Sequence, residues 1–145
     1  MDEETVERII EKTEYVRDCL EVLTEERPSD EKAYFGDSRT RDIVERRFET
    51  AIQACIDIAS MILNAENKPV PKVYSDRMEA LVDLGVLSSS TGEQMASAAG
   101  FRNVLAHRYG ADIDNGIVYD NLHDLSRFQE YLIAVGEYLS AKGAL

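Results

Sequence analysis

The feature that most constrains the fold is a long segment, from about Arg41 to Asn64, in which apolar residues recur at steps of three and four. This spacing places them on one face of an α-helix, and the apolar stripe is wide enough for the helix to lie at the centre of a core. The stripe consists of Val44, Phe48, Ala51, Ile52, Cys55, Ala59, Ile62 and Leu63. We therefore predict a central helix here.

The same periodicity, with capping residues at the expected ends, predicts helices in most of the remaining chain. The expected segments are a first helix from about Asp2 to Thr24, a short helix capped by Ser75 and ended near Gly85, a fourth helix that starts within 88–91 and runs to about His107, and a last helix capped by Asp120. Loops are expected near 28–36 and 110–116. The chain, residues 1–145, is thus predicted to be a single all-α domain, an up-and-down bundle of four main helices plus a short one.

Charge and composition exclude several classes of function. The formal net charge of −12 argues against a general coat for nucleic acid, so any contact with RNA or DNA is expected to be local. No apolar run approaches the roughly 20 residues of a membrane span, and residues 1–4 are acidic, so we expect a cytoplasmic protein without a membrane segment. Cys19 and Cys55 lack a second thiol or histidine at metal spacing; they are expected to be core thiols, and neither a metal nor another cofactor is expected.

The densest polar cluster lies at the end of the predicted fourth helix, where residues 102–109 read Arg-Asn-Val-Leu-Ala-His-Arg-Tyr before Gly110. Arginine binds phosphate with a planar fork, histidine transfers protons near neutral pH, and asparagine orients a neighbour through hydrogen bonds. Together, Arg102, Asn103 and His107 suit phosphodiester cleavage without a metal. That reaction needs a base for the ribose 2′-hydroxyl, an acid for the departing 5′-oxygen and a cation for the phosphate.

The spacing within this cluster bears on assembly. Arg102 and His107 are five residues apart, which is about 140° around an ideal helix, so they do not share a face. One chain also offers a single histidine in the cluster, whereas a symmetric dimer would supply two. The alternative is structural: Arg102 forms a surface salt bridge, and His107 interacts with the last carbonyl groups of its helix.

Several other polar residues allow a structural or a functional interpretation. His123 is expected to be solvated rather than catalytic, in the first turn of the last helix beside Asp124. Gln53 and Asp57 lie one turn apart and are either a simple hydrogen-bonded pair or a support for the site. Arg46 and Arg47 either extend a basic edge for RNA or form a solvated helix face with Glu45 and Glu49. Arg108 is a further candidate for contact with RNA. The tyrosines expected to pack their rings and keep a solvated hydroxyl are Tyr74, Tyr119 and Tyr131.

At the polar cluster the sequence resembles the HEPN superfamily, and within it the HepT-like group, whose signature is Arg, four residues, His, one residue, Tyr. Here the signature is Arg102, His107 and Tyr109. The likeness covers about 40–131: residues 51–59 are similar to the family's second helix, the residues from Pro71 to Leu87 to its middle section, and 100–103 to the start of its motif helix.

The resemblance implies a metal-independent ribonuclease that acts as the toxin of a toxin-antitoxin pair, as a homodimer whose two motif segments meet at the two-fold axis. By this likeness Arg102 stabilises the phosphate, His107 handles the proton, and Asn103 supports the geometry. Tyr109 is then the control position, adenylylated by a minimal nucleotidyltransferase antitoxin. The alternative within the superfamily is a non-catalytic module that binds nucleotide or docks a nucleotidyltransferase.

Overall fold

A computed structural model describes residues 1–107 and 113–144, and these residues form seven helices and no strand. The helices are α1 (Glu3–Glu26), α2 (Glu31–Phe35), α3 (Ser38–Ala65), α4 (Tyr74–Asp83), α5 (Ser89–His107), α6 (Asn115–Leu122) and α7 (Ser126–Ala141). The predicted all-α bundle is confirmed, and its four long helices are α1, α3, α5 and α7.

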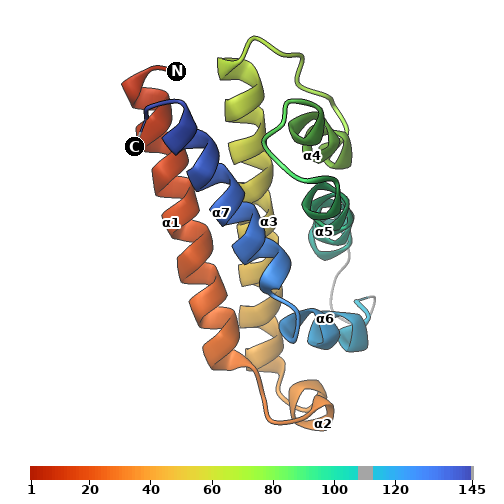
Figure 1. The fold of residues 1–145 in the computed structure, drawn as a ribbon. Helices are drawn as coiled ribbons and strands as arrows, with labels where there is room; N and C mark the ends of the chain where they lie inside the picture. Colours follow the sequence, from red (N-terminus) through yellow and green to blue (C-terminus); the bar gives the residue numbers. More distant parts are fainter. Residues whose placement is uncertain (108–112, 145) are drawn as a thin grey trace.

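The long helices are arranged around α3. In Figure 1, α1, α3 and α7 run side by side along the molecule, whereas α4 and α5 lie on the other side of α3 and are seen almost along their axes. The short helices α2 and α6 lie together at one end of the bundle. Helix α3 therefore contacts both the α1 side and the α4–α5 side.

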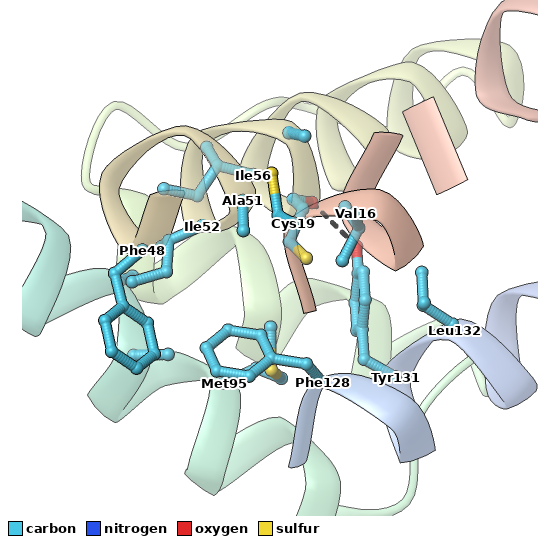
Figure 2. Packing of buried hydrophobic residues seen from close by; sticks show 14 of the residues in the cluster. Val16, Cys19, Phe48, Ala51, Ile52, Ile56, Met95, Phe128, Tyr131 and Leu132 are labelled. Carbon is cyan, nitrogen blue, oxygen red and sulfur yellow. Dashed lines mark hydrogen bonds between the residues drawn. The ribbon is translucent and has the colours of Figure 1, made fainter. Parts of the chain in front are cut away.

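The core is continuous along α3, as its apolar stripe predicted. Phe48, Ile52 and Ile56 are fully buried, and Figure 2 shows them in one cluster with Val16 and Cys19 of α1 and with Phe128 and Tyr131 of α7. Both cysteines are buried and free, which confirms the prediction of core thiols.

Tyr131 corrects one sequence-based expectation. Its hydroxyl was expected to be solvated, but the side chain is fully buried and the hydroxyl donates a 2.7 Å hydrogen bond to the carbonyl oxygen of Cys55. Burial raises the pKa of the Tyr131 hydroxyl well above its usual value, so the proton stays on the donor. The bond joins α7 to the middle of α3.

Two short helices were not predicted: α2 lies within the predicted loop at 28–36, and α6 begins at the end of the predicted turn at 110–116. α2 begins after Asp30, whose carboxylate accepts a 2.7 Å hydrogen bond from the backbone N–H of Ala33. α6 begins after Asp114, whose carboxylate accepts hydrogen bonds from the N–H groups of Gly116 at 3.0 Å and Ile117 at 3.2 Å. Each aspartate satisfies donors that the first helical turn leaves unpaired.

The predicted start of the last helix was wrong. Asp120 lies within α6, and α7 begins only at Ser126. His123 is consequently the C-terminal cap of α6 rather than part of the last helix. Its ring packs edge-to-face on Tyr119, with centroids 4.8 Å apart, and Tyr119 in turn lies 5.7 Å from the ring of Tyr34 in α2.

Helix α4 packs closely on α5 at a glycine. α4 begins at Tyr74, two residues earlier than a cap at Ser75 predicts, so Ser75 lies inside the helix and is not its cap. A Cβ atom at Gly92 would lie only 2.1 Å from Cγ2 of Val82, so even the smallest side chain there would force Val82 or one of the two helices to move. This contact sets how α4 and α5 lie against each other.

None of the helices in the described ranges is long and apolar enough to cross a membrane.

Because a Cβ at Gly92 would clash with Val82, Gly92→Ala should destabilise the protein even though alanine favours the helix. Overpacking costs about 1–3 kcal/mol, against a gain of about 1 kcal/mol in helix propensity. Urea unfolding should show a net loss, and adding Val82→Ala should cost less than the two single losses combined. Gly136→Ala is the matched control, because no atom lies within 4 Å of its added Cβ. Equal effects of Gly92→Ala and Gly136→Ala would contradict the close approach.

Candidate functional site

Helix α5, which carries the predicted motif, is fixed at its start and along one face. The hydroxyl of Ser88 accepts a 3.1 Å hydrogen bond from the N–H of Thr91, as the predicted serine caps require. Met95, Ala98 and Ala99 are buried against the rest of the bundle. The opposite face is exposed, and its residues include Ser97, Gly100, Asn103 and Val104.

An aromatic contact holds the second half of α5 on α3. The ring of Phe101 lies edge-to-face on the buried ring of Phe48, with 5.5 Å between the centroids. Leu105, one turn further on, is also buried. The packing of Phe101 and Leu105 determines the direction in which the side chains of the intervening residues, 102–104, project from the helix.

Arg102 is half-buried and lies against the N-terminal end of α4. Its guanidinium carbon is 5.6 Å from the centroid of the Tyr74 ring, within the range of a cation–π interaction. The guanidinium carbon of Arg77 is 4.8 Å from the same centroid. The structure thus brings Arg102 of the motif together with Tyr74 and Arg77, and no carboxylate in the described ranges forms a salt bridge with either arginine.

Arg77 is a site residue that the sequence reasoning missed. Its Nε donates a 2.7 Å hydrogen bond to the carbonyl oxygen of Pro71, and its Nη1 donates a 3.0 Å bond to the hydroxyl of Ser60 in α3. The spacing of Tyr74 and Arg77, one helical turn, was the available signal. It predicts their mutual contact, but not the approach of Arg102 from another helix.

Of the remaining motif residues, the structure describes Asn103 and the backbone of His107. Asn103 is exposed beside Arg102 on α5, and His107 is the last residue of that helix. The side chain of His107, together with Arg108 and Tyr109, lies outside the described residues, as does the predicted helix stop at Gly110.

The predicted supporting residues on α3 contact α1 or their own helix. Arg46 is 3.9 Å from Glu49, and Nη1 of Arg47 lies 3.9 Å from Sγ of Cys19 in α1. The predicted pair is present, because Gln53 donates a 2.9 Å hydrogen bond to Asp57, and Asp57 also lies 3.5 Å from Nζ of Lys12. None of the contacts recorded for these residues reaches Tyr74, Arg77 or Arg102.

Metal-ligating side chains do not gather in the part of the chain that the structure describes: no group of three or more His, Cys, Asp or Glu there could hold an ion.

The fold and the site together define a class of protein: an all-α bundle that carries an Arg-x4-His segment at the end of one long helix, with the arginine placed on an aromatic ring. The model of one protein family, described as Ribonuclease HepT-like, matches residues 4–135. The chain therefore belongs to this family, which confirms the resemblance drawn from the motif.

Individual relatives agree with this assignment. The chain is 23% identical over 129 residues to the mRNA nuclease HepT of Shewanella oneidensis, a match that covers 87% of this chain and 96% of that protein. Its fold is similar to that of the tri-AMPylated Shewanella oneidensis HEPN toxin in complex with MNT antitoxin, with a TM-score of 0.82, 21% identity, and 94% and 99% of the two chains covered. It is also similar to the Bacillus subtilis cytosolic protein YutE, of unknown function, with a TM-score of 0.81, 18% identity, and 96% and 93% coverage.

Proposed function

We propose that this protein is a metal-independent RNA endonuclease and the toxin of a pair whose antitoxin is a minimal nucleotidyltransferase. The observation that carries the proposal is the placement of Arg102. It is a cation held at the end of α5 without a carboxylate partner in the described ranges, in a chain that belongs to the HepT-like family. Two relatives support the same activity and partner. One is named an mRNA nuclease, and the other is a HEPN toxin in complex with an MNT antitoxin.

The chemistry assigns one role to each motif residue. A base removes the proton of a ribose 2′-hydroxyl, and the resulting oxygen attacks the adjacent phosphorus to form a 2′,3′-cyclic phosphate. The bond to the 5′-oxygen breaks as an acid gives that oxygen a proton. His107 is the proton-transfer group, Arg102 offsets the charge that develops on the phosphate, and the exposed Asn103 orients the substrate or the imidazole. Arg108, Arg46 and Arg47 are candidate contacts for the flanking RNA.

A homodimer is part of the proposal. On an ideal helix, position 107 is rotated about 140° from Arg102, and Arg102 leans towards α4, so a second protomer is the simplest way to bring an imidazole to each arginine. The exposed face of α5 suits such a contact. A Cβ at Gly100 would meet no atom within 4 Å, and Val104 on the same face is 37% exposed.

Tyr109 is proposed as the control position, two residues after His107 in sequence. Attaching AMP to its hydroxyl adds a phosphodiester charge and a nucleoside close in sequence to Arg108. The added anion would compete with RNA phosphate for the cations of the motif. The adenylyl group comes from ATP, with pyrophosphate as the leaving group.

His107→Ala and Arg102→Ala should each lower RNA cleavage by about a hundredfold or more, because each removes proton transfer or charge stabilisation. Cleavage is measured on a fluorescent RNA with antitoxin-free protein, and it should persist in EDTA. The matched controls are His123→Ala and Arg17→Ala, two exposed residues of the same types outside the motif. RNA left intact by the wild-type protein would favour the non-catalytic binding module instead.

The solution mass should be twice the 16.3 kDa of one chain by light scattering. Gly100→Glu should shift the protein towards monomer, because a charged side chain would occupy the exposed face of α5. Gly136→Glu on α7 is the control, since it adds the same side chain at a helical glycine that also has open space. A wild-type monomer at micromolar concentration would remove the argument for a composite site.

Incubation with the cognate nucleotidyltransferase, ATP and magnesium should add AMP to Tyr109. Intact mass spectrometry should show the additions in the wild type and in Tyr15→Phe, an exposed tyrosine on α1, but not in Tyr109→Phe. RNA cleavage should fall in proportion to the modification. If Tyr109→Phe is still neutralised by an active antitoxin, control runs through binding alone.

A further inference from the structure

One tyrosine ring lies against two arginines that come from different helices. Tyr74 and Arg77 are one turn apart on α4, and Arg102 approaches from α5. Both guanidinium carbons lie within cation–π distance of the Tyr74 ring centroid, at 4.8 Å for Arg77 and 5.6 Å for Arg102. The Tyr74 ring therefore connects Arg102 of the motif helix α5 to Arg77 of α4.

Arg77 ties this ring to the rest of the fold. Two of its nitrogens are used in hydrogen bonds to the Pro71 carbonyl and to the Ser60 hydroxyl, and Ser60 in turn donates a 3.0 Å bond to the carbonyl oxygen of Ile56 in α3. The Arg77 guanidinium is thereby fixed against the central helix. Because the guanidinium carbon lies 4.8 Å from the centroid of the Tyr74 ring, the fixed arginine restricts where the ring can move.

Arg102 has few other restraints in the described structure. Its Nε is buried and has no hydrogen-bond partner there, and no carboxylate of the described residues forms a salt bridge with it. An arginine side chain has many rotamers, so one that must meet a phosphate in a fixed geometry gains from a preformed support. The face of Tyr74 is the support that the structure offers.

An aromatic ring suits this task better than a carboxylate would. Asp or Glu could also hold the guanidinium, but its negative charge would cancel the positive charge and repel RNA phosphate. The π-face of a tyrosine attracts a cation while the tyrosine stays neutral. Arg102 can thus be oriented and still offer its full charge to an anion.

We propose that Tyr74 is a positioning residue for Arg102, and that Arg77 holds Tyr74 in place for this purpose. Tyr74 acts through the arginine and does not itself touch the reacting atoms. The inference rests on the proposed RNA cleavage, in which Arg102 stabilises the phosphate.

The first test compares Tyr74→Leu, which removes the aromatic face, with Tyr74→Phe, which keeps it. Tyr74→Leu should lower kcat by about tenfold or more with KM nearly unchanged, because a misplaced catalytic group costs rate. Tyr74→Phe should retain most of the wild-type activity. Tyr138→Leu is the matched control, because it removes another tyrosine with a cation over its ring, Lys142 at 5.7 Å, on α7. Equal losses in Tyr74→Leu and Tyr74→Phe would overturn the proposal.

A double-mutant comparison separates positioning from general damage. If Tyr74 acts through Arg102, the Arg102→Ala/Tyr74→Leu protein should cut RNA no more slowly than Arg102→Ala alone. Losses that multiply would show that Tyr74 acts independently of the arginine. Should Tyr74→Leu prove unfolded by circular dichroism, Arg77→Met provides the same comparison without touching the ring, and it should lower kcat by a smaller factor.

The orientation itself can be read without enzymatic activity. The Nε–Hε signal of Arg102 in ¹⁵N-labelled protein, identified by its loss in Arg102→Ala, should be shifted by the tyrosine ring current. The shift should survive in Tyr74→Phe and vanish in Tyr74→Leu. If the wild-type protein leaves RNA intact while this pattern holds, the proposed function fails but the support of Arg102 by Tyr74 stands. An Arg102 signal that Tyr74→Leu does not move would overturn the positioning itself.

Discussion

The burial of α3 is the constraint on which the rest of the structure depends. Its apolar stripe is covered on one side by α1 and α7 and on the other by α5, and Phe48 contacts an aromatic ring of both α5 and α7. The position of the candidate site depends on this arrangement. Phe48 of α3 orients α5 through Phe101, and Ser60 of α3 holds Arg77. Both α5, which carries Arg102, and Arg77, which contacts Tyr74, are thus held by residues of α3.

Close packing between α4 and α5 completes this geometry. Gly92 allows the two helices to approach at Val82, about two and a half turns before Phe101 along α5. A larger side chain at this contact would separate the helices near the start of α5, and the separation would reach Arg102 through a rigid element. Residues that never touch an anion therefore determine where the arginine lies.

The long helices could be predicted from periodicity because each has a sustained apolar stripe, and the motif could be found because Arg102, Asn103 and His107 are close in sequence. α2 and α6 were missed because they are short and their stability comes from packing on each other, through Tyr34 and Tyr119. Their capping aspartates, Asp30 and Asp114, were the local signal. The role of Tyr74 and Arg77 required the approach of α5, a contact that no local pattern encodes.

Local charge, rather than total charge, is what the proposed RNA site requires in this acidic chain. The net charge is −12, and the salt bridges in the described ranges engage Lys12, Arg46 and Lys142 with carboxylates. By contrast, residues 67–73 between α3 and α4 contain two exposed lysines and no acidic residue, and they lead directly into Tyr74. Few phosphates can be contacted by so small a basic region, so non-specific attraction to RNA stays weak. In the proposed function, cleavage then depends on how Arg102 is oriented towards the phosphate rather than on a broad basic surface.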